Sequence, residues 1–365
     1  MDHEVYMRRA LGLAERGRGL CSPNPVVGAV VVRDGRVLGE GWHEGPGTAH
    51  AEAAALDAAG DRARGAALYV TLEPCDHQGR TPPCTGAILD AGVSTVVAAT
   101  VDPNPVVNGR GFARLRAAGL EVVTPVLPDE AARQNEAFAK HVRTGVPFVV
   151  LKMAATLDGK VAARDGSSRW ITGEPARAQA HRLRAASDAI VIGAGTALAD
   201  DPALTVRDPS YRGRPPLRVL VDARGAVAAE GQLFSGEAPT VVATTEASST
   251  DRREEWAGAG ADVVVFDQEA GRVPVRSLLA HLGKRDVQTA LLEGGPTLAW
   301  SVVAQDQVDR VVLFLAPKLL GGERAPGILG GDGFAPVNQA LDVRIRNVGR
   351  LGDDLMVEAD VHRHR

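Results

Sequence analysis

The side chains of His50, Cys75 and Cys84 are of types that bind zinc. His50 offers an imidazole, and Cys75 and Cys84 offer thiolates, which are ligands that Zn²⁺ prefers. A structural zinc site is closed by four protein ligands, whereas a catalytic site keeps one position for water. The three ligands therefore predict one catalytic Zn²⁺ per chain, which would lower the pKa of its water from ~15.7 to about 7. A structural zinc site is the main alternative, and His77 is the nearby residue that could close it.

A carboxylate follows the first predicted ligand at a spacing of two residues. Glu52 can reach the water without joining the coordination shell. Because hydrolysis needs a group that carries protons between the water and the leaving group, we expect Glu52 to be the catalytic acid and base.

The pattern H-x-E…P-C…C resembles the zinc-dependent cytidine and nucleobase deaminases, in which this Glu is the general acid/base. Their common form is P-C-x-x-C, but eight residues separate Cys75 from Cys84 here. The longer loop, P-C-x-H-x-G-x-T-P-P-C, is similar to that of the riboflavin-pathway pyrimidine deaminases. Residues 22–28 (S-P-N-P-x-V-G) and 102–111 (D-P-N-P-x-V-x-G-x-G) match the same family. The resemblance implies that Asn24 contacts the substrate and that the second loop closes over the pocket.

Length and composition limit the class of protein. A chain of 365 residues is long for a single core and long enough for two domains. A net charge of −4 gives no electrostatic case for a nucleic-acid or membrane partner. Cys21 is the one cysteine left outside the predicted metal site, so we do not expect a disulfide framework. We therefore expect a cytoplasmic location. The chain has neither a signal-peptide pattern nor an apolar run of membrane-spanning length, so we expect no export and no membrane span.

Periodicity and turn residues predict an α/β first half. A hairpin turn is expected at Asp34-Gly35, and both metal-bearing segments are expected at helix N-termini against one sheet. The predicted helices cover 4–16, a segment beginning near 50, 84–91, 112–118 and a long terminal helix at 129–142; the predicted strands cover 26–33, 36–42, 67–71, 95–100 and 121–124.

A Gly- and Pro-containing break at residues 143–147 predicts an interdomain joint, with domains at 1–145 and 146–365. The second half reads as strand, loop, helix and strand with a Gly-rich turn, an α/β nucleotide-binding pattern. A G-x-G-x-x-G fingerprint is absent, so a Rossmann domain is not supported. Strands are predicted at 148–151, 217–221, 240–244, 263–265 and 289–292, with 310–315 as a final core strand; residues 188–196 belong to the strand and Gly-rich turn of this pattern, and residues 248–260 are polar and uninformative.

The second half also resembles a known enzyme. Residues 152–159 meet the pattern K-x-A-x-S-L-D-G, with Thr156 in place of Ser, which keeps the hydroxyl. With the first half, the match is to the bifunctional deaminase–reductases of riboflavin biosynthesis and covers essentially the whole chain. The resemblance implies an N-terminal cytidine-deaminase-like three-layer α/β/α domain, and a C-terminal α/β domain similar to dihydrofolate reductase that uses NADPH.

The resemblance also assigns roles in the second domain. It implies cofactor contacts at Ala154, Trp170, Thr196 and Asp200, and substrate contacts at Ser168, Arg184, Leu204 and Arg207. Guanidinium forks match phosphate oxygens, so Arg184 and Arg207 suit a ribose 5-phosphate, although a solvated surface is the usual place for either. Lys152 is a further candidate.

The segment from Glu293 to Thr297 passes from a strand into a helix through glycines. Backbone amides at a helix start suit a pyrophosphate, and the family places the cofactor phosphates at Gly294 and Gly295, with Glu293 toward the substrate; a plain turn is the alternative. Asp222 ends a predicted strand and by itself favours a free 2′-hydroxyl. We expect Arg224, just beyond it, to read the 2′-phosphate of NADPH.

The resemblance implies a cytoplasmic enzyme with two active sites that acts on small-molecule pyrimidine ribose phosphates, and we expect a homo-oligomer, dimer or tetramer. A nucleic-acid deaminase fused to a binding module is one alternative, disfavoured by the acidic balance. A structural-zinc protein with an inactive nucleotide-binding half is another, disfavoured by the presence of Glu52 and Lys152.

Overall fold

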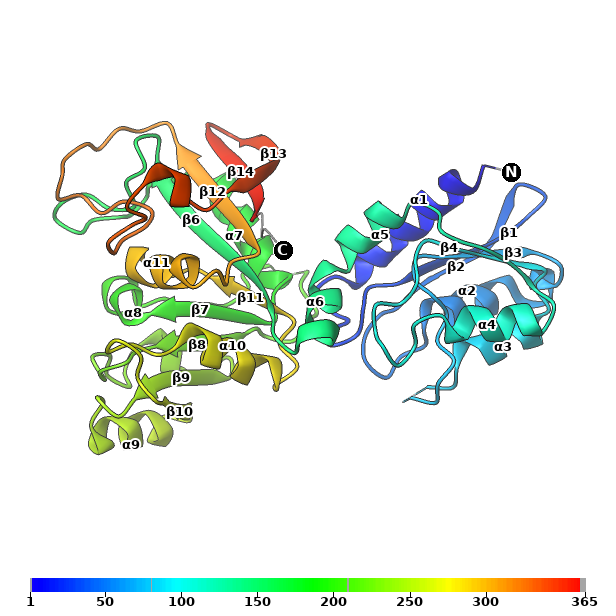
Figure 1. Cartoon of the computed structure of the whole chain (residues 1–365), viewed down its shortest axis with the longest axis horizontal. Coiled ribbons are helices and arrows are strands. Elements are labelled where there is room, and N and C mark those ends of the chain that lie inside the picture. The colour runs from blue at the N-terminus through cyan, green and yellow to red at the C-terminus, as the bar shows by residue number, and fades with distance from the viewer. Residues whose placement is uncertain (1, 80, 209, 362–365) are drawn as a thin grey trace. The chain divides into compact units, whose positions relative to one another are not determined.

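The computed structural model describes residues 2–79, 81–208 and 210–361, and Arg80 of the predicted metal-binding segment lies outside them. The chain divides into two compact units, Met1–Gly145 and Val146–Arg365. Each unit has its own β-sheet and its own buried cores (Figure 1). Within the described residues, no helix is both long and apolar enough to cross a membrane.

The first unit is a three-layer α/β/α sandwich, as predicted. Its sheet has the order β2-β1-β3-β4-β5, in which β1 runs antiparallel to β2 and β3, and β3, β4 and β5 are parallel. Figure 1 shows α1 and α5 on one face of this sheet and α2, α3 and α4 on the other. The strands are β1 (Gly28–Arg33), β2 (Arg36–Trp42), β3 (Ala67–Val70), β4 (Thr95–Ala98) and β5 (Glu121–Val123), and the helices are α1 (His3–Ala14), α2 (Ala51–Ala59), α3 (Cys84–Ala91), α4 (Arg110–Ala117), α5 (Pro128–Gln134) and α6 (Glu136–Thr144).

Two cores form because alternate strand residues face opposite sides of the sheet. Val30 of β1 packs in the core that contains Met7 of α1, while Val31 packs in the core that contains Ala55 of α2. The turn between β1 and β2 has positive φ at Asp34 (52°) and Gly35 (76°), as a tight hairpin requires, so the predicted turn is confirmed.

Glycines bring α2 close to β2. A Cβ atom at Gly39 would lie 2.2 Å from the carbonyl oxygen of Ala55, and one at Gly41 would lie 2.5 Å from that of Ala51. Since any side chain at these positions would push the helix away, the two glycines set the height at which His50 and Glu52 stand over the sheet.

The long helix predicted at 129–142 is wrong, because the chain forms two helices, α5 and α6, that break at Asn135. The buried Asn135 side chain accepts a hydrogen bond from the backbone N–H of Val26 and donates one to its carbonyl, both at 2.9 Å. An Asn that bonds to backbone groups competes with helix formation. The break therefore ties the loop after Asn24 to the end of the unit.

The second unit is built on a nine-stranded sheet of order β10-β9-β8-β7-β11-β6-β12-β14-β13. The first seven strands in this order are parallel, and β14 and β13 add an antiparallel hairpin at one edge. The strands are β6 (Phe148–Thr156), β7 (Ala189–Gly193), β8 (Leu217–Val221), β9 (Thr240–Thr245), β10 (Asp262–Phe266), β11 (Thr289–Leu292), β12 (Arg310–Ala316), β13 (Val343–Leu351) and β14 (Asp354–Val361), and the helices are α7 (Glu174–Ala185), α8 (Ala194–Asp200), α9 (Thr250–Gly258), α10 (Val275–Gly283) and α11 (Pro296–Ala304).

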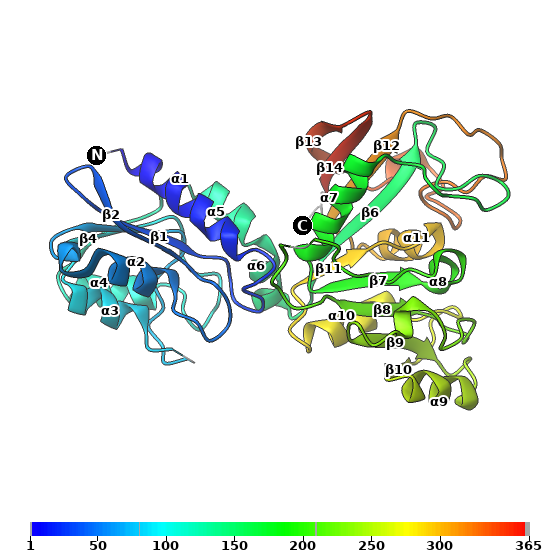
Figure 2. The same cartoon turned by 180° about the vertical axis from the view of Figure 1, so that it is seen from behind.

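Helices cover both faces of this sheet, as the predicted α/β pattern requires. Val191 of β7 packs in the core that contains Leu278 of α10 and Val302 of α11. Its neighbour Ile192 packs in the opposite core with Trp256 of α9. Figure 1 shows α10 and α11 in front of the sheet, and Figure 2, from behind, shows α7 on the other face.

One expectation for the second half is wrong. β12 is not the final strand, because β14 pairs with it and β13 with β14. β13 was not predicted because its side chains, such as Ile345, are largely exposed, so buried and exposed residues do not alternate along it. The polar residues 248–260 contain α9, which begins at an N-cap bond from Arg252 N–H to Ser249 Oγ and buries one large side chain, Trp256.

Candidate active sites

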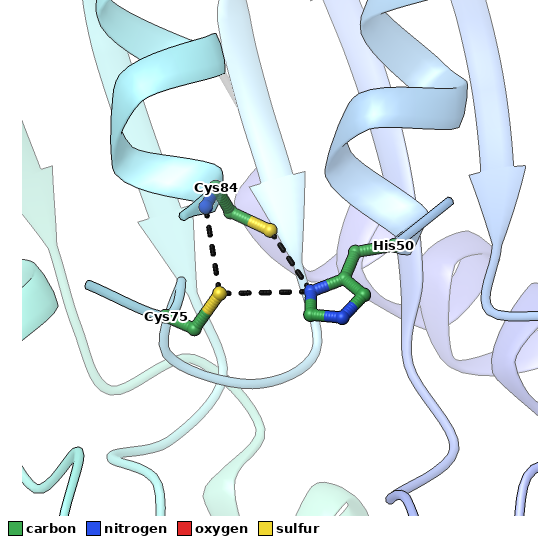
Figure 3. Close-up of side chains that lie close together, drawn as sticks. All are labelled: His50, Cys75 and Cys84. Atoms are coloured by element: carbon green, nitrogen blue, oxygen red, sulfur yellow. Dashed lines mark hydrogen bonds between the residues drawn. The ribbon is translucent and has the colours of Figure 1, made fainter. Parts of the chain in front are cut away.

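The three predicted metal ligands come together in the first unit. His50 is the N-cap of α2, Cys84 is the first residue of α3, and Cys75 lies in the loop after β3 (Figure 3). The Nδ1 atom of His50 is 3.1 Å from Cys84 Sγ and 3.6 Å from Cys75 Sγ. The three ligand atoms all lie within 4.8 Å of one another.

This donor set fits zinc. Zn–S bonds of ≈ 2.3 Å and Zn–N bonds of ≈ 2.0–2.1 Å bring ligand atoms about this close around one ion. Among the described residues, the cluster contains no fourth protein ligand, and His77 lies in the wall of the adjoining cavity instead. On the far side of the ring, His50 Nε2 is 3.2 Å from Thr81 Oγ1, a contact that orients the imidazole with Nδ1 toward the thiols.

Hydrogen bonds make the two thiols unequal. The bond from Cys84 lowers the pKa of Cys75, helped by His50, and the same bond raises the pKa of Cys84. The backbone N–H of Cys84 also donates to Cys75 Sγ at 3.4 Å. A dication at this point would favour the thiolate form of both residues.

Glu52 lies in the first turn of α2 and is 4% exposed. Burial raises the pKa of its carboxyl to about 7, and the charge of Cys75 acts in the same direction. A carboxyl that titrates near neutrality can both accept and donate a proton, as a general acid/base must. Glu52, His50 and Cys75 share the wall of a cavity of about 330 Å³, which we call the Glu52 cavity.

Asn24 also lines the Glu52 cavity, and a buried histidine fixes its amide. His43 Nδ1 is 3.2 Å from the carbonyl of Ala49, so that nitrogen carries the proton, and His43 Nε2 then accepts from Asn24 Nδ2 at 2.9 Å. The carbonyl oxygen of Asn24 is therefore the atom turned to a ligand. Below His43, the buried thiol of Cys21 donates to the His43 carbonyl, and burial raises the pKa of Cys21 to about 12, so this cysteine is structural.

Two further cavities adjoin in the second unit. We call them the Thr196 cavity (about 520 Å³) and the Glu293 cavity (about 550 Å³), and both are lined by Val161, Ser168 and Asp200. Of the predicted residues, the Thr196 cavity also includes Thr196 and Gly295; the Glu293 cavity also includes Lys152, Ala154, Trp170, Arg184, Arg207 and Glu293. The parallel strands β6, β7 and β11 end here, where α/β folds place their ligands.

A buried ion cluster stands in the Glu293 cavity. Arg184 donates to both carboxylate oxygens of Glu293, at 2.7 and 2.9 Å, and Lys152 Nζ is 3.7 Å from Glu293 Oε2. Burial alone would raise the pKa of Glu293, but Lys152 and Arg184 outweigh it and lower the pKa to about 2. Beside them, burial and the two nearby arginines lower the pKa of His181, which favours its neutral form.

Other predicted positions lie outside the cavity walls. Leu204 is 2% exposed and packs in a core, and Gly294 abuts the Leu298 side chain. Asp222 is buried, and its oxygens accept the backbone N–H groups of Gly225 and Val227, so the carboxylate closes a turn. Among the described residues, the Thr196 cavity wall includes Arg272 but neither Asp222 nor Arg224.

Sequence reasoning missed His43, His181 and Arg272 as cavity residues. His43 carried one usable signal, because it directly follows a strand that leads toward the zinc ligands. His181 is a single residue on a helix face and Arg272 is one of many arginines, so neither stands out in the sequence.

Comparison with known proteins relates each half of the chain to a known domain family. Residues 1–100 match the model of the cytidine and deoxycytidylate deaminase zinc-binding region, and residues 147–357 match that of the RibD C-terminal domain. Riboflavin biosynthesis protein RibD of Escherichia coli is 40% identical over 97% of this chain and 98% of its own length. The chain belongs to the RibD family. RibD of Aquifex aeolicus is 41% identical over 96% of each chain.

Solved RibD structures share the fold of the whole chain. Acinetobacter baumannii RibD (form 1) superposes with a TM-score of 0.89 at 36% identity, covering 99% of both chains. A Thermotoga maritima structure described as a diaminohydroxyphosphoribosylaminopyrimidine deaminase/5-amino-6-(5-phosphoribosylamino)uracil reductase superposes with a TM-score of 0.87 at 37% identity. This RibD family member is thus an enzyme of riboflavin biosynthesis with a deaminase domain that carries a zinc-binding region and a reductase domain, which implies a nicotinamide cofactor.

Proposed function

We propose that residues 1–145 deaminate the pyrimidine of 2,5-diamino-6-ribosylamino-4(3H)-pyrimidinone 5′-phosphate, and that residues 146–365 reduce the resulting 5-amino-6-ribosylaminouracil 5′-phosphate to its ribityl form with NADPH. The observation that carries the proposal is the Glu52 carboxyl buried beside the His50–Cys75–Cys84 cluster, in one chain with the paired Thr196 and Glu293 cavities. The name of the Thermotoga maritima relative supports the choice of substrates.

In the first step, water adds to the carbon that bears an amino group, and ammonia leaves. A zinc ion held by His50, Cys75 and Cys84 would lower the pKa of a bound water. Glu52 is placed to take a proton from the attacking water and to deliver it to the departing amino group. Asn24 donates its amide N–H to His43, and its carbonyl oxygen accepts a hydrogen bond from the substrate.

The second step adds hydride to C1′ of the ribose and opens the sugar ring. NADPH supplies the hydride, and the ring oxygen must gain a proton as its bond to C1′ breaks. The Lys152 ammonium lies in the Glu293 cavity and can donate this proton, while its ion pair with Glu293 holds it in place. Arg207 lines the same cavity and suits the 5′-phosphate.

We infer that the cofactor occupies the Thr196 cavity and is NADPH rather than NADH. Gly295 lies at the start of α11, where backbone N–H groups suit a pyrophosphate. Arg272 lines this cavity, and the Arg224 side chain approaches Gly271 next to it. Arg224 thus lies near the part of the cavity wall that Arg272 forms, and a guanidinium there suits a 2′-phosphate.

We also propose a cytoplasmic homo-oligomer. Val343, Ile345 and Val348 of the edge strand β13 are 47%, 62% and 55% exposed, a row of apolar side chains suited to a second copy of the chain.

One assay tests the proposal. The purified protein is given the diaminopyrimidinone phosphate and NADPH, and ammonia and NADPH absorbance are followed with and without a chelator. We expect the chelator to abolish ammonia release and added zinc to restore it, with NADPH oxidation following ammonia. Ammonia release that persists in the zinc-free protein would contradict the assignment.

A further inference from the structure

Glu73 is a buried carboxylate that the deaminase chemistry does not use. It lies between β3 and the ligand Cys75 and is 3% exposed. Its oxygens accept four backbone N–H groups from a single downstream segment: Oε2 accepts from Asp102 (3.2 Å) and Gly109 (2.8 Å), and Oε1 from Gly111 (2.9 Å) and Phe112 (3.3 Å).

That segment, residues 102–112, forms part of the Glu52 cavity. Asp102, Asn104 and Val107 line this cavity together with His50 and Cys75. Up to the start of α4 at Arg110, the segment is held by turn bonds: Asp102 Oδ1 accepts the N–H of Asn104 at 2.8 Å, and the Asn104 carbonyl accepts that of Val107 at 3.0 Å. These bonds are local and do not join the segment to the metal-ligand loop, whereas the four bonds to Glu73 do.

A close approach joins the same segment to the metal-ligand loop. A Cβ atom at Gly111 would lie 1.9 Å from the carbonyl oxygen of Pro74 and 3.3 Å from Glu73 Oε1. The first turn of α4 is therefore seated directly against the residue that precedes Cys75. Glu73 also stands at the N-terminal end of α4, where a negative charge is stabilised by unpaired amide groups and the helix dipole.

We propose that Glu73 is a positioning residue of the deaminase site, which holds residues 102–112 over the Glu52 cavity so that Asp102 and Asn104 meet the substrate. This inference rests on the proposed deaminase function. The carboxylate is needed because it only accepts hydrogen bonds. A glutamine would turn an NH₂ group toward two of the four amide donors, which would lose their partner and face another donor.

The test compares Glu73→Gln with wild type and with Glu121→Gln, an exposed carboxylate on β5 that serves as the matched control. Glu73→Gln should retain zinc, because it leaves the three ligands unchanged. Its KM for the diaminopyrimidinone phosphate should rise about tenfold or more, with a smaller change in kcat. Reductase turnover on the deaminated intermediate should match wild type, and so should every property of the control.

Hydrogen–deuterium exchange gives the readout that separates positioning from general stabilisation. Backbone amides of residues 102–112 should exchange about tenfold faster in Glu73→Gln, since the loop loses charge-assisted bonds, while α2 keeps its protection. Exchange unchanged in residues 102–112, an unchanged KM or loss of zinc would each overturn the proposal. Wild-type protein without deaminase activity would contradict the proposed function instead, and the exchange comparison would still decide the role of Glu73.

If the glutamine variant does not fold, Glu73→Asp replaces it. The shorter carboxylate keeps the charge but cannot reach all four amides, so a smaller rise in KM and in loop exchange is expected. Aspartate with wild-type KM and exchange would overturn the proposal.

Discussion

Arg184 donates hydrogen bonds to both carboxylate oxygens of Glu293, at 2.7 and 2.9 Å, inside the cavity proposed for the reductase substrate. A third bond, from Arg184 Nη1 to the Thr205 carbonyl, fixes the guanidinium further. Because these bonds occupy its guanidinium, Arg184 is better placed to orient the Glu293 carboxylate than to bind a phosphate. Arg207, which is exposed at the same cavity, is the freer cation of the two to meet the ribose phosphate.

The Glu293 cluster predicts a pH-dependent stability. The folded-state pKa of Glu293 is about 2, below its unfolded value, so its stabilisation is complete above the unfolded pKa and is lost as the pH falls toward 2. Glu293→Gln should lower the free energy of unfolding at pH 7 by roughly 3–5 kcal/mol, because it leaves buried charges unpaired.

Denaturant unfolding of the wild type and Glu293→Gln at pH 7 and pH 3 checks this expectation. The difference in the free energy of unfolding between the two proteins should be smaller at pH 3 than at pH 7. An equal difference at both pH values would show that the ionised Glu293 carboxylate does not cause it.

The metal assignment predicts about one zinc per chain. Cys84→Ala removes a thiolate from the cluster and should lose most of the metal, whereas Cys21→Ser should keep both metal and activity, since the Cys21 thiol only bonds to a backbone carbonyl. Elemental analysis of the purified variants measures the difference. Full zinc occupancy in Cys84→Ala would remove that residue from the site.

Glu52→Gln should keep zinc and lose deamination. The amide has nearly the same shape but cannot carry a proton, and general acid/base groups contribute ~10²–10⁴-fold. Ammonia release at saturating substrate is the measurement. A loss of only a few-fold would show that another group moves the proton.

Cofactor selectivity should depend on the two arginines near the Thr196 cavity. Arg224→Ala and Arg272→Ala should each raise the KM for NADPH more than the KM for NADH, with the larger change for Arg272, which lines the cavity wall. A phosphate that loses a cation loses a charge-assisted bond, whereas a 2′-hydroxyl does not. An equal rise in the KM for NADPH and for NADH would show that the arginines do not bind the 2′-phosphate.

Local signals in the sequence predicted most of the fold. The Asp34-Gly35 turn, the starts of α2 and α3, and the β11–α11 junction are each set by nearby residues, and all are confirmed. The misses depend on distant contacts. Asn135 breaks a helix because it bonds to Val26, and β13 is a strand because β14 lies beside it.

The same distinction holds for the sites. The three proposed zinc ligands could be predicted because their residue types and the motif around them are visible in the sequence, and the structure brings them together. Glu73 is tied to residues about thirty or more positions away, and Asp222 uses its carboxylate to close a turn; neither role has a local signature.

The central claim is that one chain carries two chemically separate active sites. Its most direct test gives the zinc-loaded Glu52→Gln variant the already deaminated 5-amino-6-ribosylaminouracil 5′-phosphate and follows NADPH oxidation. Because Glu52 lies in the first unit and the Thr196 and Glu293 cavities are lined by residues of the second, we predict wild-type reductase turnover, together with loss of ammonia release from the diaminopyrimidinone phosphate. Loss of reductase turnover in the folded, zinc-loaded variant would contradict the account.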